Sequence, residues 1–529
     1  MKKMMLLILL GIFAGFNGYS QARDSLNVTK LGHLPYTPIL NDIWGYADTL
    51  GNEYALVGTR TSFSIVDVTQ PTNPVELVSI QGSNSTWRDI KTWDHYAYVV
   101  HDYQSGPSNG ILIVDMDSLV NPRFKEFKPI VMVDTSFYFY QRAHNIWIDE
   151  NGVLYAFGTN ADFKTLMFDL SSDPWNPTYL GYIPGYYHHD GYARNDTLYG
   201  SAIYAGALAA YDVRFKSSPV FLSQVSSPNQ FNHNCWLSDD GNYVFTTDEV
   251  QAGYIGAYDV SDVMNMTEID RYQKYPGTDV IPHNAHVYGD FLVTSYYTAG
   301  VNILDISDPH NLFEVGFYDT SPFQGPGYNG AWGAYPYLPS GNLLVSDMEE
   351  GLFVLEPAYI PAARLTLEVY DSLTKVKLPL VEVVSVRLSD TLETDLKGLA
   401  RIATLNVGPE FVILSKQGYH NDTISFNYVN GQNPLVKVAM RPLNLDIKEN
   451  SIHDLWVENP IQGQIRIRSQ SLLGQRVRIE LVSMTGSLIL SEKVELSSET
   501  FIPVDLPSGV YHIRILSDKG YFGQKLINR

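Results

Sequence analysis

The feature that most constrains the fold is an internal repeat of short strand-like runs, each ending in an acidic residue and a turn. The runs read SIVDVTQP, ILIVDMDS, LMFDLSSDP, LAAYDVRF, IGAYDVSD and NILDISDP, and a shorter seventh reads LFVLEP. Their acidic residues are Asp67, Asp115, Asp169, Asp212, Asp259, Asp305 and Glu356. Successive acidic residues are 48, 54, 43, 47, 46 and 51 positions apart. Repeats of roughly 40–50 residues are typical of β-propeller blades.

Each unit also has an upstream segment in which a polar pair begins a strand-like run. The clearest examples are HNIWID from His144, HNCWLS from His233 and HNAHVY from His283. One further strand-like run lies between the polar pair and the acidic residue, and another follows the acidic turn. Four short strands repeated seven times predict an all-β protein whose main body, residues 23–357, is a seven-bladed β-propeller.

The repeated aspartates have a structural explanation. An Asp side chain followed by Ser, Thr or Pro can accept hydrogen bonds from the next backbone N–H groups and fix the turn into the outer strand. The alternative is an array of calcium ligands. Because the six aspartates are spaced one to a unit, turn formation is the better interpretation.

The repeat resembles the LVIVD-repeat proteins, a β-propeller family also described as choice-of-anchor B. The resemblance covers about residues 41–356, and its core string, ILIVDM from Ile111 to Met116, recurs in degenerate form in every unit. It implies the propeller fold and a surface location. It implies no activity, because propellers carry hydrolases, oxidoreductases, lectins and scaffolds alike.

The polar pairs form two columns of equivalent positions that we expect at one rim of the propeller channel. In a propeller the innermost strand starts at the face where the second strand ends, so both strands contribute to this rim. The first column reads Asn41, Arg88, His144, His189, His233, His283 and Asn329. The second reads Asp42, Asp89, Asn145, Asp190, Asn234, Asn284 and Gly330. Side chains alternate along a strand, so the two columns face opposite ways, and one of them should line the channel mouth.

Two kinds of site are compatible with these columns. A ligand pocket at the mouth would use Arg88, Asp89, His101, Asp102, His189, Asp248, Glu249 and Asp347. A transition metal, the one cofactor that the pattern suggests, would be held by His144, His189, His233 and His283, because imidazole suits Zn, Cu, Fe or Ni. The alternative is structural: the His and Asn/Asp pairs would hydrogen-bond backbone groups between adjacent blades.

Composition and the remaining motifs exclude several classes of protein. The formal charge is −21, which argues against a nucleic-acid partner, since that would need a basic face. Cys235 is the only cysteine, so no intramolecular disulfide forms, and we interpret it as a small buried apolar residue. The G-x-G-x-x-G string from Gly325 to Gly330 contains Pro326 and precedes a strand-like run, which is incompatible with a dinucleotide site.

The N-terminus predicts export. Lys2 and Lys3 precede an uncharged apolar run from Met4 to Phe16, and small residues follow at Ser20 and Ala22. This pattern is typical of a signal peptide, here residues 1–22. The run is shorter than the roughly 20 residues that a membrane-spanning helix needs, and no later segment is long and apolar enough, so no transmembrane segment is expected.

Two small β-domains follow the propeller. Residues 362–444 alternate polar and apolar residues near Leu365–Tyr370, Val381–Leu388, Leu399–Leu405 and Phe411–Ser415, which predicts a small β-sandwich. The segment resembles the carboxypeptidase regulatory-like, transthyretin-like fold through the turn at Asp395–Gly398, then Gly408 and the Gly418–Tyr419 pair. Such modules serve as spacers, and no catalytic residue follows from the resemblance.

Residues 450–529 resemble the C-terminal sorting domain of the type IX secretion system of Bacteroidetes. The matching strings are ENP from Glu458, VSMTGSLIL from Val482, LPSGVYHIRI from Leu506 and the closing GQKLINR. The resemblance implies export through the Sec pathway, then passage across the outer membrane with removal of this domain. It implies the translocon and its sorting machinery as partners, and a protein that is secreted or attached at the outer-membrane surface.

Two functions remain open at this point. The first is a non-catalytic surface module whose propeller binds a protein, a glycan or a small ligand, and this needs no special chemistry. The second is a metal-dependent hydrolase or oxidase with its site at the His-rich mouth.

Overall fold

The repeat units fold into antiparallel sheets that follow one another around a ring. The computed structural model describes residues 25–103, 109–443 and 452–529. Each sheet of the ring begins with an innermost strand that carries or directly follows the polar pair, and in six sheets the third strand ends in the repeated aspartate. The short runs rich in Val, Ile, Tyr and Phe form these strands because such side chains fit a pleated, buried surface.

The strands of each sheet follow one another from the innermost outward. The first sheet contains β3 (Leu40–Ala47), β4 (Glu53–Thr59), β5 (Ser62–Asp67) and β6 (Val75–Gln81). The second contains β7 (Ile90–Trp93), β8 (Tyr96–Val99), β9 (Ile111–Asp115) and β10 (Arg123–Phe127). The third contains β13 (Asn145–Ile148), β14 (Val153–Phe157), β15 (Thr165–Asp169) and β16 (Thr178–Ile183). The fourth contains β17 (Asp190–Arg194), β18 (Thr197–Ala202), β19 (Ala207–Asp212) and β20 (Val220–Ser226).

The remaining sheets complete the ring. The fifth contains β21 (Asn232–Leu237), β22 (Tyr243–Asp248), β23 (Ile255–Asp259) and β24 (Thr267–Tyr272). The sixth contains β25 (Ala285–Tyr288), β26 (Phe291–Ser295), β27 (Val301–Asp305), β28 (Phe313–Tyr318) and β1 (Ser25–Leu26). The last contains β29 (Ala331–Tyr335), β30 (Leu343–Asp347), β31 (Gly351–Pro357) and β2 (Val28–Leu34). Short 3-10 helices occur at η1 (Ile203–Ala205) and η2 (Val263–Asn265).

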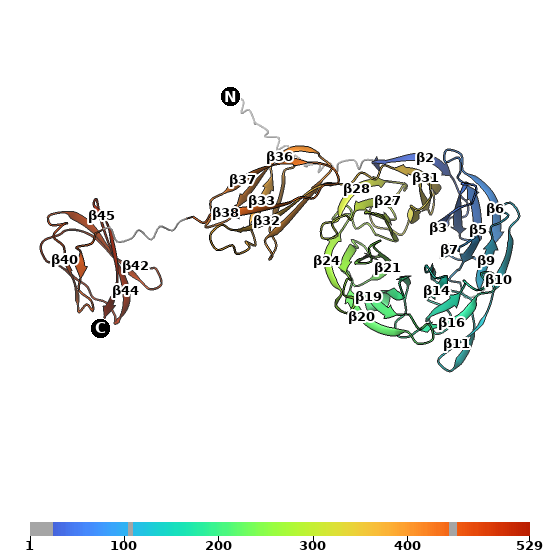
Figure 1. Ribbon diagram of the computed structural model, residues 1–529, viewed down its shortest axis with the longest axis horizontal. Helices are drawn as coiled ribbons and strands as arrows, with labels where there is room; N and C mark the ends of the chain where they lie inside the picture. The colour runs from blue at the N-terminus through green and yellow to red at the C-terminus, as the bar shows by residue number, and fades with distance from the viewer. Residues whose placement is uncertain (1–24, 104–108, 444–451) are drawn as a thin grey trace, which may run out of the picture. The chain divides into compact units, whose positions relative to one another are not determined.

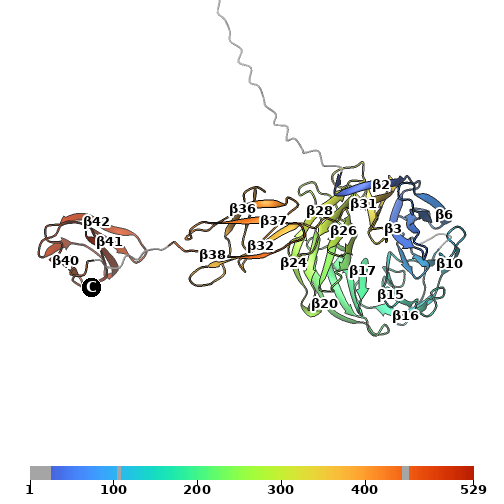
Figure 2. The same cartoon turned by 45° about the horizontal axis from the view of Figure 1, so that its top comes forward.

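The ring is closed by the N-terminal strands. β2 pairs antiparallel with β31 as the outermost strand of the last sheet, and β1 extends the sixth sheet beside β28. Blue β2 lies beside yellow β31 in both ribbon views (Figures 1 and 2). The innermost strand β29 also contacts β3. Pairing between segments some 320 residues apart therefore joins the two ends of the propeller, and the all-β propeller architecture expected from the repeat is confirmed.

The repeated aspartates form turns, as the sequence predicts. In each of the six units with an Asp, its Oδ1 accepts a hydrogen bond from the backbone N–H two residues later, at 2.9–3.2 Å. Asp305 has a further role, because it is buried and pairs with Arg364 at 2.9 Å. The repeat's acidic residue is thus mainly a device of backbone geometry.

The longest repeat interval contains an added hairpin. β11 (Ile130–Val133) pairs with β12 (Ser136–Phe139) between the second and third sheets. Val131 and Val133 are buried on one face of this hairpin, whereas Phe137 and Phe139 are exposed on the other. The 54-residue spacing between Asp115 and Asp169 is therefore an insertion and leaves the blade pattern intact.

The middle module forms two sheets. One has the strand order β35 (Leu399–Thr404), β32 (Ala363–Asp371) and β38 (Leu435–Met440). The other has the order β34 (Asp390–Glu393), β33 (Glu382–Ser385), β36 (Gly408–Ser415) and β37 (Asp422–Tyr428). Four of these strands overlap the four expected ones, and β34, β37 and β38 were not foreseen. The carboxypeptidase regulatory-like assignment stays a prediction.

The C-terminal module also contains two sheets. One has the order β39 (Trp456–Val457), β40 (Gln464–Arg468) and β43 (Thr500–Pro503). The other has the order β42 (Leu488–Glu495), β41 (Arg476–Ser483), β44 (Gly509–Ser517) and β45 (Gly520–Asn528). Buried Ile479, Ile513 and Leu526 form part of its own hydrophobic core.

The chain divides into two compact units, one with the propeller and the middle module and one with the C-terminal module. The domain boundaries 23–357, 362–444 and 450–529 stay predictions. The expected signal peptide, residues 1–22, lies outside the described residues. Within the part of the chain that the structure describes, no helix has the length and apolar character needed to cross a membrane.

Candidate functional site

Four histidines from successive sheets meet at one end of the propeller channel. His144 and His189 stand directly before β13 and β17, His233 lies in β21, and His283 precedes β25. Because they occupy equivalent repeat positions, their rings follow one another from sheet to sheet. The ring centroids are 3.9 Å apart for His144 and His189, 4.3 Å for His189 and His233, and 4.5 Å for His233 and His283. We call these four side chains the histidine row.

Two tryptophans flank the histidine row. The ring of Trp87 lies 5.7 Å from that of His144, and the ring of Trp332 lies 4.7 Å from that of His283. Together with their neighbours they enclose a pocket of about 300 Å³, its open mouth included. This mouth pocket is lined by Asp42, Trp87, Arg88, Asp89, His144, Asn145, His189, His233, His283, Asn284 and Trp332. The space inside it that a water-sized occupant can reach is only about 20 Å³, far below the roughly 300–1,000 Å³ of ordinary small-molecule sites.

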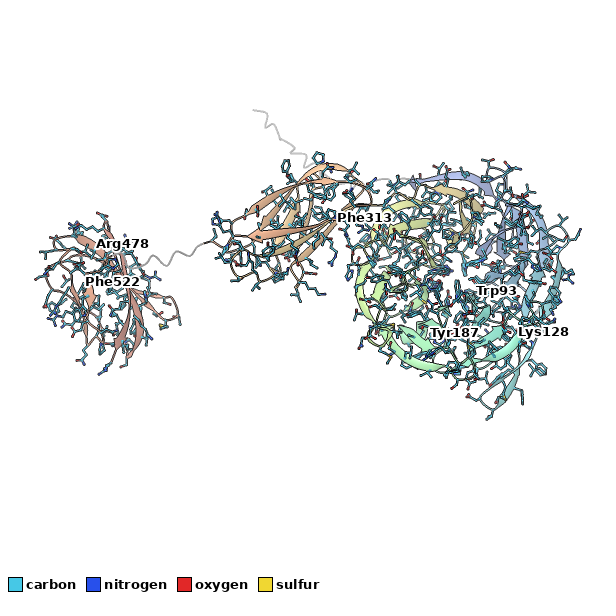
Figure 3. All side chains as sticks on the ribbon, in the orientation of Figure 1. Trp93, Lys128, Tyr187, Phe313, Arg478 and Phe522 are labelled. Atoms are coloured by element: carbon cyan, nitrogen blue, oxygen red, sulfur yellow. The ribbon has the colours of Figure 1, made fainter. Side chains whose placement is uncertain are left out.

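Side chains crowd the interior of the ring (Figure 3). Tyr187, labelled there, lies toward the interior of the ring, and its own ring is 6.5 Å from that of His189. Gly158 approaches both His144 and Tyr187, because a Cβ at Gly158 would lie 3.0 Å from each of them. The close packing leaves room for a very small occupant only.

Two carboxylates contact the row. Asp102 follows β8, and its Oδ2 lies 2.9 Å from Nδ1 of His144, while Arg142 pairs with its other oxygen. Glu249 follows β22, and its Oε2 and Oε1 lie 3.5 Å from Nε2 of His233 and 3.8 Å from Nε2 of His283. Both ends of the row therefore have an acidic partner.

Burial controls the protonation of these groups. It lowers the pKa of His283 to about 3, and it lowers the pKa of His189 and His233 well below the ordinary value, with their histidine neighbours adding to the effect. Burial also raises the pKa of Glu249 to about 7. At neutral pH these three imidazoles are therefore uncharged, and each retains one nitrogen lone pair.

The second column forms a different structure, which we call the polar belt: Asp42, Asp89, Asn145, Asp190, Asn234 and Asn284. Oδ2 of Asp89 accepts a hydrogen bond from the backbone N–H of Ile146 in the next sheet at 2.9 Å. Asp42 likewise accepts a hydrogen bond from the backbone N–H of Ile90 at 3.2 Å, and Asn234 accepts one from that of Ala285 at 3.0 Å. The interpretation that polar pairs join adjacent blades describes this column.

Charged groups within the belt compensate one another. Buried Lys91 lies 2.9 Å from Oδ1 of Asp89 and 4.6 Å from the centre of the Trp44 ring. Burial and the neighbouring Asp89 raise the pKa of Asp190 to about 6, and the same two causes raise the pKa of Asp42 well above its ordinary value. The belt is a buried network in which removal of one charge leaves another without its partner.

A third layer, two residues after the belt on each innermost strand, consists of side-chain rings. In the second sheet Lys91 takes the position that a ring occupies in the other sheets. The layer contains Trp44, Trp147, Tyr192, Trp236, His286 and Tyr335. Tyr192 and Trp236 are 4.8 Å apart, and Trp236 and His286 are 4.6 Å apart. Trp147, Trp236 and His286 line, together with the belt, a second pocket, in which a water-sized occupant can reach only about 10 Å³.

The structure brings together some of the expected site residues and separates others. Arg88, Asp89 and the four histidines line the mouth pocket, and Asp102 and Glu249 contact its histidines. The guanidinium of Arg88, however, donates to the carbonyls of Thr59 and Ser83.

The other three expected residues lie elsewhere. His101 lines a separate cavity between the first two sheets. Asp248 accepts a hydrogen bond from the backbone N–H of Asn229. Oδ2 of Asp347 accepts one from Oγ1 of Thr320 at 2.8 Å.

In the last unit the expected column positions were wrong by three residues. Trp332 and Gly333 occupy the places assigned to Asn329 and Gly330, and Tyr335 stacks 4.8 Å from Trp44. The Asn329 side chain is exposed and donates to Glu349 at 2.6 Å instead. A register shift between Ala331 and Gly333 places Trp332 at a bulge, as the shift between Asn232 and Asn234 does for His233. The last unit was misassigned because it has Trp and Gly in place of a polar pair, while Asn329 lies three residues upstream.

Sequence reasoning also missed Trp87, Trp332 and Tyr297 as site residues. Trp87 stands directly before the column residue Arg88, which is a signal that could have been used. Tyr297 donates a 2.5 Å hydrogen bond to Oε1 of Glu249. It lies in neither polar column, so the repeat gives no signal for it. The interpretation of Cys235 is confirmed: it is buried, and burial raises the pKa of its thiol to about 12.

Family models match two segments of the propeller and the C-terminal module. Residues 49–81 and 283–320 match the LVIVD repeat, and residues 459–529 match the secretion system C-terminal sorting domain. The chain carries LVIVD repeats and a sorting tail. A type IX sorting tail indicates secretion and surface attachment, with the type IX sorting machinery as partner. No curated protein matches the chain.

Solved structures give similar folds at low identity. A putative 6-phosphogluconolactonase from Bacteroides fragilis is 13% identical over 57% of this chain and 97% of its own, with a TM-score of 0.41. The Cps50 (Swd1) β-propeller domain of Myceliophteria thermophila is 11% identical over 62% and 98%, with a TM-score of 0.43. Raptor of Chaetomium thermophilum is 12% identical over 63% of this chain and 29% of its own, with a TM-score of 0.44. Nothing about activity follows from likenesses of this size.

Proposed function

We propose that the chain is an exported β-propeller protein that binds a small cation in its mouth pocket, without catalysis. The observation that carries the proposal is that the four histidines line one pocket while Asp102 and Glu249 contact them. Neutral imidazole nitrogens and carboxylate oxygens are acceptors, so their common ligand is a cation. The small volume favours an ion or a very small organic cation over a glycan or peptide.

The contrast with the polar belt supports this proposal. Belt side chains such as Asp89 and Asn234 direct their oxygens at backbone N–H groups of the next sheet. In the row, the four imidazoles line the pocket, and Asp102 and Glu249 contact them. Nδ1 of His189 and Nδ1 of His233 are buried and have no hydrogen-bond partner among the described residues, as is also true of Oδ1 of Asn145 and Asn284 in the belt. Buried polar atoms without a partner cost free energy, which a ligand in the pocket can recover.

The export route forms the second part of the proposal. The apolar run before Ala22 acts as a Sec signal peptide, and the C-terminal module then directs the chain across the outer membrane and is removed. The middle module, with its carboxypeptidase regulatory-like pattern, separates the propeller from the sorting module. A chain truncated before Ile452 is expected to remain in the periplasm, and its appearance at the cell surface would contradict this route.

The binding proposal is tested by titrating the full chain with Zn²⁺, Ca²⁺ and methylammonium while following tryptophan fluorescence and heat of binding. Trp87 and Trp332 flank the pocket, so an occupant should change the emission. We expect at least one of these cations to bind at one site per chain. Absence of binding by all three would overturn the proposed function.

A metal-dependent hydrolase or oxidase is the second candidate function. One observation favours it, namely the close approach of Glu249 to both His233 and His283. Turnover of a substrate only with metal present would establish it, and metal binding without turnover would support the binding function.

A further inference from the structure

At the edge of the mouth pocket, two of its histidines and the neighbouring Glu249 bring ligand atoms close together. Nε2 of His233 lies 3.5 Å from Oε2 of Glu249, and Nε2 of His283 lies 3.8 Å from Oε1 of the same carboxylate. The three ligand atoms all lie within 4.8 Å of one another. In a tetrahedral zinc site with bonds of about 2.0–2.1 Å, neighbouring ligand atoms are about 3.3 Å apart. The two Glu–His distances exceed this value by about 0.2 and 0.5 Å, and shifts of up to about 1.5 Å would bring all three ligand atoms to metal-binding geometry.

The tautomer of His283 leaves Nε2, the nitrogen that faces Glu249, unprotonated and able to bind a metal. Its Nδ1 lies 2.5 Å from the carbonyl oxygen of Trp332, which can only accept, so Nδ1 carries the proton. In the neutral ring Nε2 then presents a lone pair toward Glu249. A lone pair that faces a carboxylate oxygen is repulsive unless a proton or a cation lies between them. The arrangement therefore calls for a positive species at this point.

The surroundings orient the carboxylate as well. Tyr297 donates to Oε1 of Glu249 at 2.5 Å, and its ring lies 4.8 Å from that of His283. Groups that hydrogen-bond to metal ligands in this way fix their orientation and raise affinity.

We propose that His233, Glu249 and His283 bind one divalent transition-metal ion, for which Zn²⁺ is the best match. Two imidazoles and one carboxylate are a ligand set that Zn²⁺ accepts with a fourth position open. The proposal rests on the proposed function, since it names the cation that the mouth pocket takes. His144 and His189 line the pocket beside the ion, and Nδ1 of His144 is already held by Asp102.

A second cluster of acidic residues and a histidine offers a control. His95, Asp115 and Asp117 also bring three ligand atoms within 4.8 Å of one another. Asp117 is exposed, however, and Asp115 is paired with Arg123. Zinc on this cluster would be a surface contact, and His95→Ala would remove it without touching the mouth pocket.

The experiment measures zinc per chain after incubation of the full chain with Zn²⁺ and desalting, and the absorption spectrum of the Co²⁺-loaded chain. We expect one metal ion per chain in the wild type and in H95A, with the intense visible bands of tetrahedral Co²⁺. The variants E249Q and H283N should bind at least 100-fold more weakly. E249Q is nearly isosteric and can still accept the Tyr297 hydrogen bond, so it keeps the test valid if H283N fails to fold.

Retention of metal in both E249Q and H283N, or its loss in H95A alone, would overturn the proposal. Absence of bound zinc in the wild type would also overturn it. If Ca²⁺ or methylammonium then bound the pocket while Zn²⁺ did not, the metal site would be refuted and the proposed cation-binding function would stand.

Discussion

The histidine row and the polar belt occupy adjacent positions in the same strands, yet their polar atoms do different things. Asp190 accepts two side-chain hydrogen bonds, from Asn234 at 2.8 Å and Asn145 at 3.1 Å. Its neighbour His189 lies between two other imidazoles and is tilted against both, and its Nδ1 has no partner among the described residues. A repeated polar position is therefore not by itself evidence of a site. What its polar atoms face, backbone N–H groups in the belt and carboxylates at the two ends of the row, distinguishes a joint between blades from a place for a ligand.

The largest effect should follow from breaking the belt. Asp89→Ala would leave Lys91 buried without its closest carboxylate and the Ile146 N–H without an acceptor. We expect the free energy of unfolding to fall by about 3–5 kcal/mol. Urea denaturation of the full chain measures it, with Asp212→Ala, at a partly exposed turn, as the control that should change little. A loss of less than about 1 kcal/mol for Asp89→Ala would remove the structural role of the belt.

The belt should also respond to pH through Asp190. Its pKa is raised from 3.8 to about 6 by burial and Asp89, so between these values the folded state holds a proton that the unfolded state has released. Stability due to this group therefore falls as the pH rises from about 4 to 6. Asp190→Asn lacks this titration and can keep both amide hydrogen bonds. The free energy of unfolding of Asp190→Asn, relative to that of the wild type, should therefore increase by up to about 3 kcal/mol between pH 4 and pH 7.

Denaturation curves of the two proteins across that range give the difference directly. A constant difference across the whole pH range would contradict the raised pKa. A difference that shrinks with rising pH would reverse the sign of the effect and would contradict it as well.

A ligand bound at the histidine row should raise the free energy of unfolding, and changes in the belt should not remove this effect. At free Zn²⁺ of about 100 times its Kd, an ion that binds only the folded state should add about 2.7 kcal/mol to the free energy of unfolding. The gain should be absent in Glu249→Gln and present in Asp190→Asn. Thermal and urea unfolding with and without zinc would show it, and an equal gain in Glu249→Gln would place the ion elsewhere.

The smallest effect should follow from changing a row residue without metal. His233 is neutral and its Nδ1 has no partner in the described chain, so His233→Asn disturbs less hydrogen bonding between sheets than Asp89→Ala does. We expect a loss of about 1 kcal/mol or less. A loss as large as that of Asp89→Ala, measured in the same urea series, would mean that the row is as structural as the belt.

The blades and the polar columns could be predicted because the repeat fixes both strand order and side-chain direction. Spacing from Asp67 to Asp305 gave the strands, and the His-Asn and His-Asp pairs gave the row and the belt. The prediction for the last unit failed because Trp332 and Gly333 replace the polar pair there, and Asn329 three residues upstream was taken for it.

Which acidic side chains face the histidines could not be predicted from the sequence either. Asp248 and Glu249 are neighbours at the end of β22, yet Asp248 accepts from Asn229 and Glu249 faces the histidines. Which of two adjacent carboxylates points inward depends on the turn that follows the strand. The contact of Tyr297 with Glu249 depends in turn on how two sheets meet.

X-ray absorption at the zinc edge of the Zn²⁺-loaded full chain tests most directly whether the row and Glu249 form one metal site. Imidazole ligands give characteristic outer-shell scattering, so they can be distinguished from carboxylate and water. We predict two imidazole ligands and one carboxylate at about 2.0–2.1 Å. A zinc environment with oxygen ligands and no imidazole would contradict the proposed site.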